Sequence, residues 1–236
     1  MEYYNLLRSI HEYLRPRTYV EIGVRHGESM CLASAETLAI GVDPSAEIMF
    51  PLGPRARLYG LTSDEFFSCY DLAAELAGLP VDLAFIDGMH LFEYALRDFA
   101  NLERSCSPQS VVLIHDCLPI DRVTSARERT TDVWSGDVWK LVTCLRRHRP
   151  DLSVTTVDVP PTGLGIVTGL DPTSTTLTVR YEELYSSYVP LDHDDLLAVD
   201  KDAALNRASW DWTTVAAVLD RRLTGALPGR RPATST

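Results

Sequence analysis

The chain has 236 residues, of which 22 are Lys or Arg and 33 are Asp or Glu, so its formal net charge is -11 at pH 7. This acidic balance argues against a nucleic-acid partner, because polyanions are bound through clustered basic side chains. The hydrophobic fraction of 45% is that of a globular protein, and no apolar run approaches the roughly 20 residues that a membrane helix requires. We therefore expect a folded protein that associates neither with nucleic acid nor with a membrane.

The N-terminal residues and the cysteines indicate a cytoplasmic protein. Segment 1–8 has an early acidic residue and no long apolar core, unlike a secretory signal. The five cysteines are odd in number and widely spaced, and none belongs to a CxxC pair, which argues against a disulfide framework or a zinc knuckle. We expect reduced thiols that are mostly buried.

Short β-branched runs alternate with longer amphipathic stretches in the first half of the chain. The expected strands are 18–23, 39–43, 57–60, 81–87 and 110–116, and the expected helices are 28–38, 64–77 and 90–104. Strands that alternate with helices predict a parallel sheet with helices on both faces, and nearly continuous apolar strands are typical of such a sheet.

The second half of the chain is less regular. A polar, arginine-containing stretch at 121–132 predicts a loop or lid, and a helix is expected at 136–149. Two strands at 152–157 and 163–168, joined by a proline-rich turn, favour an antiparallel pair. The predicted fold class is α/β: a Rossmann-like, doubly wound, mostly parallel seven-stranded sheet with an antiparallel last strand and helical additions at both ends.

The predicted domain organisation follows from these elements. Residues 1–17 form an N-terminal helical cap, 18–170 the Rossmann-like domain, and 171–226 a C-terminal helical extension packed on it. Residues 227–236 are rich in Pro, Gly, Arg and Thr and predict a disordered tail.

The ends of the first two strands predict a nucleoside site, since ligands of open parallel sheets bind outside the carboxyl ends of the strands. Gly23 and Gly27 end the first strand, and glycines there let the backbone approach a ligand closely. Their GxxxG spacing differs from the GxGxxG of dinucleotide-binding proteins, which makes a nicotinamide oxidoreductase a distant alternative. Asp43 ends the second strand, where a carboxylate can bind a ribose diol. Glu21 suits a ligand that carries an ammonium group, so an adenosine joined to an amino acid fits these features.

Four segments occur in the order and spacing of a known family. They are 20–29 (VEIGVRHGES), 41–44 (GVDP), 82–90 (DLAFIDGMH) and 111–116 (VVLIHD). They resemble the class I S-adenosylmethionine-dependent methyltransferases, and within them the small-molecule O-methyltransferases of the macrocin type. The resemblance implies S-adenosylmethionine as the cofactor of the Rossmann-like domain. The residues that it assigns to the cofactor are Glu21, Gly23 and Gly27 for the methionine part, Asp43 for the ribose, Ser63 and Asp64 for the adenine, and Asp87 beside the methyl donor.

Asp87, His90, His115 and Asp116 follow two adjacent central strands and should meet beside the methyl donor. Metal-dependent members of the family that the chain resembles have an acid at the place of Asp87 and an acidic pair at the end of the fifth strand. We therefore expect Asp87, His115 and Asp116 to hold Mg²⁺, or a softer ion such as Mn²⁺, Fe²⁺ or Zn²⁺, which would lower the pKa of the acceptor hydroxyl. The alternative is a metal-free reaction in which His90 or His115 is the general base.

The leading functional hypothesis is an O-methyltransferase acting on a hydroxyl of a small molecule, such as a sugar or phenol in antibiotic biosynthesis. A non-catalytic nucleoside-binding module is the alternative from another class, and the polar cluster that follows the central strands favours the enzyme. The aromatic residues that could enclose the acceptor are Tyr3, Tyr4, Trp134, Trp139, Tyr185 and Tyr188, although core packing is the more common role for any one of them. The identity of the acceptor, and whether the chain forms a homo-oligomer, stay open.

Overall fold

The computed structural model of the protein describes residues 2–224, so the tail predicted at 227–236 lies outside the described residues. The strands are β1 (Thr18–Ile22), β2 (Leu38–Val42), β3 (Ala56–Tyr59), β4 (Val81–Ile86), β5 (Cys106–His115), β6 (Ser153–Val157), β7 (Leu164–Thr168) and β8 (Arg207–Ala208). The helices are α1 (Glu2–Leu14), η1 (Met30–Leu32, a 3-10 helix), α2 (Ser63–Cys69), α3 (Leu72–Glu75), α4 (Phe92–Glu103), α5 (Trp139–His148), α6 (Thr176–Val179), α7 (Tyr181–Tyr188), α8 (His193–Leu197), α9 (Lys201–Leu205) and α10 (Trp212–Thr224).

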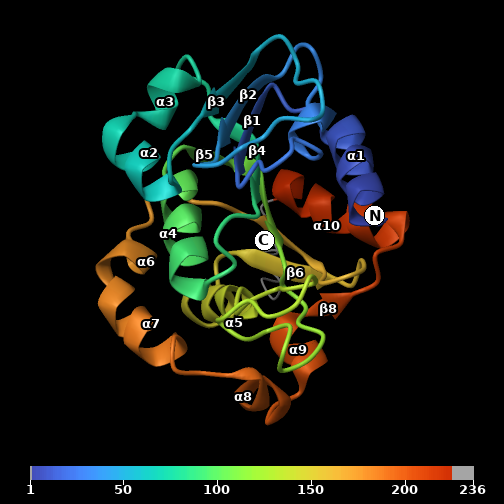
Figure 1. Ribbon diagram of the computed structural model, residues 1–236, viewed down its shortest axis with the longest axis vertical. Coiled ribbons are helices and arrows are strands. Elements are labelled where there is room, and N and C mark those ends of the chain that lie inside the picture. The colour runs from blue at the N-terminus through green and yellow to red at the C-terminus, as the bar shows by residue number, and fades with distance from the viewer. Residues whose placement is uncertain (1, 225–236) are drawn as a thin grey trace, which may run out of the picture.

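The strands form one sheet in the order β3-β2-β1-β4-β5-β7-β6-β8 (Figure 1). All neighbouring pairs are parallel except those of β7, which runs antiparallel to both β5 and β6. This confirms the predicted mostly parallel α/β class with an antiparallel last strand. The number of strands differs by one, because the two-residue strand β8 pairs with β6 at the edge and is too short to show a sequence period.

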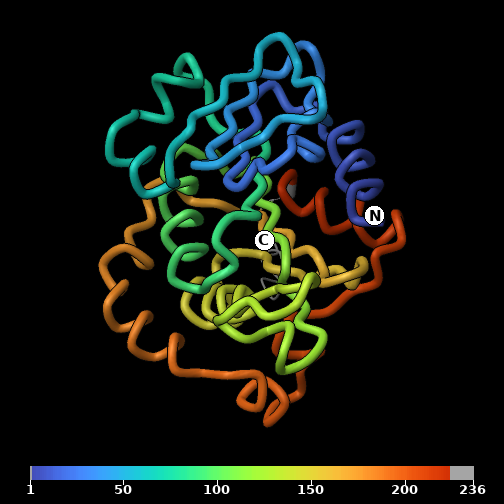
Figure 2. Tube along the Cα trace, in the orientation of Figure 1, coloured from blue at the N-terminus to red at the C-terminus, as the bar shows by residue number. Residues whose placement is uncertain are grey.

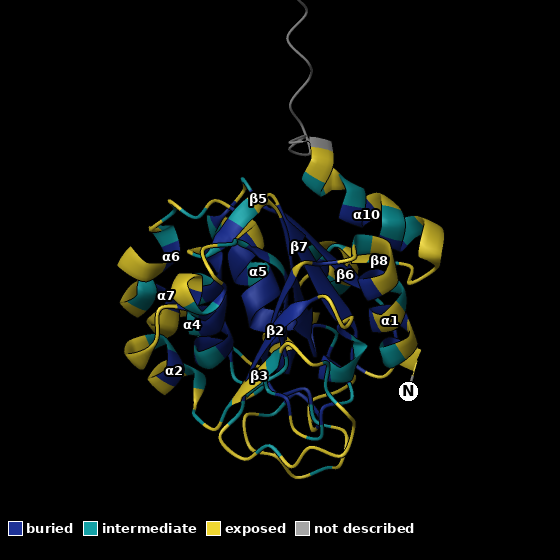
Figure 3. Cartoon of the chain, turned by 90° about the horizontal axis from the view of Figure 1, so that it is seen from above, coloured by how far each residue is buried: buried dark blue, intermediate teal, exposed yellow. Residues whose placement is uncertain are grey.

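Helices cover both faces of the sheet (Figures 1 and 3). Side chains that alternate along the strands divide the core in two. Val20 and Ile40 belong to the core that the sheet shares with α4 and α5. Tyr19 and Phe85 belong to the core that it shares with α1 and α10. The inner strands β1, β2, β4, β6 and β7 are therefore almost wholly buried, whereas β3 at the sheet edge is partly exposed. Burial on both faces explains the continuous apolar sequence of the inner strands.

The C-terminal segment returns to the N-terminal helix. The chain passes through α6 to α9 at the rim of the molecule, and α10 then lies beside α1 (Figure 2). The Tyr13 hydroxyl donates a hydrogen bond of 2.9 Å to Asp220, and the Tyr13 ring meets Trp212 edge-on at 5.3 Å. Elements from the two ends of the chain thus cover one face of the sheet together.

The helix predicted at 28–38 is wrong, since this connection contains only the single turn η1. The Ser29 hydroxyl donates a 2.5 Å hydrogen bond to the buried Glu21 carboxylate, which fixes the start of the segment against β1. Farther along, the Ser34 and Thr37 hydroxyls lie 2.9 Å apart, and the Thr37 amide donates to the Ser34 carbonyl oxygen. These local bonds by Ser and Thr compete with helical hydrogen bonding.

Two other helix boundaries differ from the predicted ones. The stretch 64–77 is divided into α2 and α3, because the backbone is extended at Tyr70 and the Asp71 carboxylate then caps a new helix by accepting from the Ala73 amide at 3.0 Å. The helix predicted to start at His90 begins at Phe92, because His90 is left-handed with φ of 55°.

The structure also bears on membrane association and on the cysteines. None of the described helices combines the length and the apolar character needed to cross a lipid bilayer. All five cysteines are free thiols, and Cys106, Cys117 and Cys144 are buried.

Candidate active site

A cavity of about 840 Å³ opens where the strand order reverses, outside the carboxyl ends of β1, β2 and β4. Its walls come from α1, from the segments that follow these strands and β5, from the first turn of α2, and from loop 129–134. Of the residues predicted to bind the cofactor, Gly23, Asp43, Ser63, Asp64 and Asp87 all line this one cavity.

Gly23 and Asp43 define the part of the cavity above β1 and β2. Gly23 has a φ of 88°, and a Cβ atom there would lie 2.1 Å from the Asp87 carbonyl oxygen, so only glycine fits. The Asp43 carboxylate accepts hydrogen bonds from the amides of Val24 and Arg25 at 2.9 and 2.8 Å, and from the Ser45 amide at 2.7 Å. It is therefore held in place at the cavity wall by the backbone.

Glu21 and Gly27 are not among the residues that line the cavity. Glu21 is fully buried, and its carboxylate accepts hydrogen bonds from the hydroxyls of Tyr19 at 2.6 Å and Ser29 at 2.5 Å. Burial raises the pKa of Glu21 to about 8 against the opposing effect of these two bonds. Gly27 lies against Leu52 and Ile48 of the next loop. The structure thus gives both residues positions that support the glycine loop from outside the cavity.

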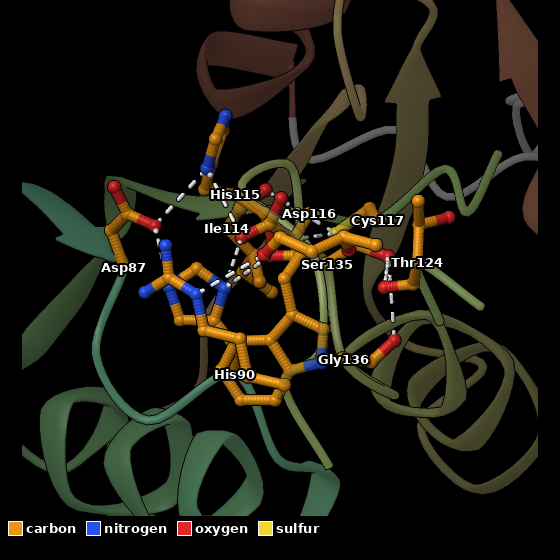
Figure 4. Close-up of polar contacts among 12 residues, drawn as sticks. Asp87, His90, Ile114, His115, Asp116, Cys117, Thr124, Ser135 and Gly136 are labelled. Atoms are coloured by element: carbon orange, nitrogen blue, oxygen red, sulfur yellow. Dashed lines mark hydrogen bonds and ion pairs between the residues drawn. The ribbon is translucent and has the colours of Figure 1, made fainter. Parts of the chain in front are cut away.

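Asp87, His90, His115 and Asp116 meet at the ends of β4 and β5, with their side chains directed toward one another (Figure 4). His90 Nδ1 lies 2.7 Å from Asp116 Oδ2, and His90 Nε2 lies 3.6 Å from Asp87 Oδ1. His115 Nδ1 lies 3.1 Å from Asp87 Oδ1 and 3.2 Å from Asp116 Oδ2. Both His90 and Asp116 have a left-handed backbone, with φ of 55° and 62°. Such strained conformations often occur at functional sites.

The four side chains strongly perturb one another. Burial disfavours the charged imidazoles, but hydrogen bonds and the charges of Asp116 and Asp87 outweigh burial and raise the pKa of both His90 and His115. Burial also favours a protonated Asp116, but the two histidines outweigh it and lower the pKa of this carboxyl. The two histidines and Asp116 therefore stabilise one another's charged forms.

The donor set of this cluster fits a divalent cation. Asp87, His90 and Asp116 each offer one ligand atom, and these atoms lie within 4.8 Å of one another. Carboxylate and imidazole ligands suit Mg²⁺, Mn²⁺, Fe²⁺ or Zn²⁺. The predicted set of Asp87, His115 and Asp116 stays a prediction, and the geometry adds His90. His90 follows Asp87 by three residues, a spacing from which the sequence could have indicated it as a ligand.

Loop 119–137 covers one side of the cluster. The Trp134 ring stacks on His90 at 5.1 Å between centroids, and its carbonyl oxygen lies 3.0 Å from His90 Nδ1. Gly136 allows this approach, because a Cβ atom there would collide with the His90 carbonyl oxygen. On the other side, Tyr3 packs its ring on His115 at 4.3 Å.

Only some of the aromatic residues expected near the acceptor line the cavity. Tyr3, Tyr4 and Trp134 line it, whereas Trp139, Tyr185 and Tyr188 are not among the lining residues. Trp139 and Tyr188 belong to the hydrophobic core. The sequence did not indicate several other lining residues. Arg25 lies within the glycine-loop segment but was given no role, and Thr62, Tyr94, Asp98 and Arg129 occupy helices and loops without a recognisable motif.

Comparison with known proteins agrees with this arrangement. Residues 20–117 match a family model described as a methyltransferase domain. A search among curated proteins finds no match. The O-methyltransferase TomG from Streptomyces achromogenes, involved in tomaymycin synthesis and solved with SAM, has a TM-score of 0.55 and 15% identity over 72% of this chain and 80% of that chain. An O-methyltransferase from Bacillus cereus, solved with SAH, has a TM-score of 0.53 and 13% identity over 70% of this chain and 79% of that chain.

At these identities the solved structures are evidence of a shared fold. The family match covers residues 20–117, the segment that contains β1 to β5 and carries both the glycine loop and the Asp-His cluster.

Proposed function

We propose that the protein is an S-adenosylmethionine-dependent O-methyltransferase that methylates a hydroxyl of a small molecule, such as a sugar or phenol of natural-product biosynthesis. One observation supports this most strongly: a single cavity joins the glycine loop and Asp43 to the cluster of Asp87, His90, His115 and Asp116. A donor and an acceptor can therefore meet in one enclosed space. Two proteins of similar fold support the proposal, since both are O-methyltransferases, one solved with SAM and the other with SAH.

The donor would lie across the ends of β1 and β2. Gly23 lets the backbone come close to the methionine part. Asp43 accepts a hydrogen bond from a ribose hydroxyl through the one lone pair, on Oδ1, that its three amide partners leave free. The sulfonium would then face the Asp-His cluster at the ends of β4 and β5.

Methyl transfer needs little covalent help from the protein, because the sulfonium is already activated. The acceptor oxygen attacks the methyl carbon as the carbon–sulfur bond breaks, its electron pair goes to sulfur, and the hydroxyl proton is lost to a base. The protein must align oxygen, carbon and sulfur and favour a negative charge on the oxygen. Tyr3, Tyr4 and Trp134 line the cavity beside the cluster and would hold the acceptor there.

A divalent ion held by Asp87, His90 and Asp116, with His115 beside them, would bind the acceptor hydroxyl and lower its pKa. The metal-free alternative uses His90 as the base that takes the proton. A raised pKa means that His90 holds its proton more tightly, so the metal-free reaction would speed up as the pH rises through the pKa of His90. We favour the metal, because the converging carboxylates satisfy a cation directly.

The test is transfer of a labelled methyl group from S-adenosylmethionine to a panel of catechols and hydroxylated glycosides. We expect labelled product in the presence of Mg²⁺ or Mn²⁺, no product after exhaustive treatment with EDTA, and recovery when the ion is restored. Activity that survives chelation would support His90 as the base. Tight binding of S-adenosylhomocysteine without methylation of any acceptor would favour the non-catalytic module.

We also propose the cellular location and the partners of the enzyme. We expect a cytoplasmic enzyme with a small-molecule acceptor and no nucleic-acid partner, since the chain is acidic and the cavity at the strand ends is of small-molecule size. Whether two chains associate can be tested by light scattering.

A further inference from the structure

Two apolar side chains are exposed to water at the wall of the cavity. Met89 is 54% exposed and Val133 is 43% exposed. Among the large apolar side chains that are exposed within residues 2–224, these two line the cavity. Isolated apolar side chains are common on protein surfaces, but a pair of them in a ligand cavity forms a surface that a ligand can cover.

Met89 and Val133 flank the residues of the reacting centre. Met89 immediately precedes His90, and Val133 immediately precedes Trp134. The Trp134 ring stacks on His90 at 5.1 Å, and the Asp137 amide donates a hydrogen bond of 3.1 Å to the His90 carbonyl oxygen, so the two segments lie side by side. An acceptor whose hydroxyl reaches His90 therefore has the rest of its structure close to Met89 and Val133, at the mouth of the cavity.

Local hydrogen bonds hold the segment that carries Val133. The Thr131 hydroxyl donates to the Val133 carbonyl oxygen at 2.7 Å. Arg129 donates from Nε to the Thr131 carbonyl oxygen at 3.4 Å and from Nη2 to the Asp132 carbonyl oxygen at 3.3 Å. A wall that is already ordered loses little conformational entropy when a ligand binds to it.

The aromatic walls beside the cluster offer ring faces more than polar atoms. Trp134 Nε1 donates a hydrogen bond of 2.6 Å to the Ala126 carbonyl oxygen, and the hydroxyls of Tyr3 and Tyr4 interact with each other. A polyhydroxylated acceptor would leave hydroxyl groups unpaired against these rings, which is unfavourable. An aromatic acceptor can instead stack on them.

We propose that the acceptor is a phenol with an apolar substituent, and that Met89 and Val133 bind this substituent at the mouth of the cavity. This inference rests on the proposed O-methyltransferase function and chooses between its two classes of acceptor. The reacting hydroxyl lies at the Asp-His cluster, the phenol ring lies against the aromatic walls, and the substituent removes Met89 and Val133 from water. Acceptor specificity then rises with the apolar area of the substituent.

The experiment is a competition between 4-methylcatechol and 4-butylcatechol at equal concentrations, with labelled S-adenosylmethionine and Mn²⁺. The initial ratio of the two methylated products equals the ratio of their kcat/KM values. Each of the three additional methylenes should favour the longer acceptor by about twofold or more when it is partly buried, so the butyl product should exceed the methyl product by about eightfold or more.

Met89→Gln and Val133→Thr nearly keep the size of each side chain and make it polar. Each variant should lower the product ratio by about twofold or more, and the double variant should lower it further. Met49→Gln and Val123→Thr are the matched controls, since Met49 and Val123 are exposed but do not line the cavity, and they should keep the wild-type ratio. The product ratio does not depend on the amount of active protein, which separates acceptor contact from a structural role.

A product ratio near one for the wild-type protein would overturn the proposal, as would an unchanged ratio in the double variant. Faster methylation of a hydroxylated glycoside than of either catechol would also overturn it. Each of these results leaves the proposed methyltransferase function intact, because methylated product is formed. If the wild-type protein methylates neither catechols nor glycosides, the acceptor proposal and the proposed function both fail.

Discussion

At the scale of single residues, Asp43 and Asp87 have different tasks in the proposed reaction. Asp43 is fixed by three backbone amides beside the glycine loop, and Asp87 contacts both histidines of the cluster. Asp43→Ala should weaken the binding of S-adenosylhomocysteine by about tenfold or more, since it removes charge-assisted hydrogen bonds and also loosens the loop. Asp87→Ala should keep that affinity within about threefold and lower turnover by about a hundredfold or more.

Calorimetric titration and initial rates of labelled methyl transfer measure these two effects. Asp71→Ala removes a helix-capping carboxylate outside the cavity and serves as the control, with binding unchanged. An unchanged affinity in Asp43→Ala would contradict the ribose assignment.

Glu21 makes stability depend on pH in a predictable direction. Its pKa is raised by burial to about 8 in the folded protein, against about 4.5 for an ordinary glutamate. As the pH rises from about 4.5 to 8, the unfolded chain releases this proton before the folded chain does, so the free energy of unfolding falls. Below this window the group contributes no pH dependence. A glutamine at this position cannot ionise, so the Glu21→Gln variant should not show this fall in unfolding free energy.

Urea denaturation at pH 5, 6.5 and 8 tests this expectation. Relative to the wild-type protein, Glu21→Gln should gain stability with rising pH, by an amount on the order of a few kcal/mol at pH 8. Glu36→Gln, at an exposed position, should follow the wild-type profile. Parallel pH profiles for Glu21→Gln and the wild-type protein would show that Glu21 titrates normally.

At the scale of elements, loop 119–137 depends on one arginine for its attachment. Arg127 donates from Nη1 to Asp137 at 2.6 Å and from Nη2 to Glu93 at 2.6 Å, and so ties the loop to α4. Asp137 also accepts a hydrogen bond of 2.7 Å from the Phe92 amide at the start of α4. Because the same loop presents Trp134 to His90, the attachment of Arg127 holds one wall of the cavity in place.

Arg127→Met should therefore release this wall while leaving the sheet intact. We expect faster amide hydrogen exchange over 121–135, a loss of roughly 1–3 kcal/mol in unfolding free energy, and weaker apparent acceptor affinity. S-adenosylhomocysteine affinity should stay within about twofold. Arg122→Met is the matched control, since Arg122 lies in the same loop and its ion pairs within residues 2–224 are with the exposed carboxylates of Asp192 and Asp194. Unchanged exchange in Arg127→Met would contradict the anchoring role.

The strands were easier to predict than the helices for a physical reason. The central parallel strands are buried on both faces and are recognisable as apolar runs, as at 81–86 and 111–115. The connection 28–38 contains helix-forming residues, but two contacts keep it from forming a helix. The Ser29 hydroxyl donates to Glu21, and the Ser34 and Thr37 hydroxyls contact each other in a turn. The contact with Glu21 exists only in the folded chain. Local propensity therefore predicted a helix that tertiary hydrogen bonds prevent.

At the scale of the whole molecule, the site joins parts of the chain that the sequence keeps far apart. Strand ends made Gly23, Asp43, Asp87 and Asp116 predictable, because the carboxyl ends of parallel strands share one edge of the sheet. The remaining walls come from α1, α2 and α4, from loop 129–134 and from Pro161 and Thr162. No period in the sequence distinguishes Trp134, which stacks on His90, from Trp139, which lies in the core. Tertiary packing determines which of these two tryptophans lies at the site.

The central claim is that this cavity holds S-adenosylmethionine. The most direct measurement is a calorimetric titration of the wild-type protein with S-adenosylhomocysteine, first in EDTA and then with Mn²⁺. We predict one molecule bound per chain with micromolar affinity in both conditions, since Gly23 and Asp43 are not part of the metal cluster. The absence of binding in both conditions would contradict the account, because the glycine loop and Asp43 would then have no nucleoside ligand.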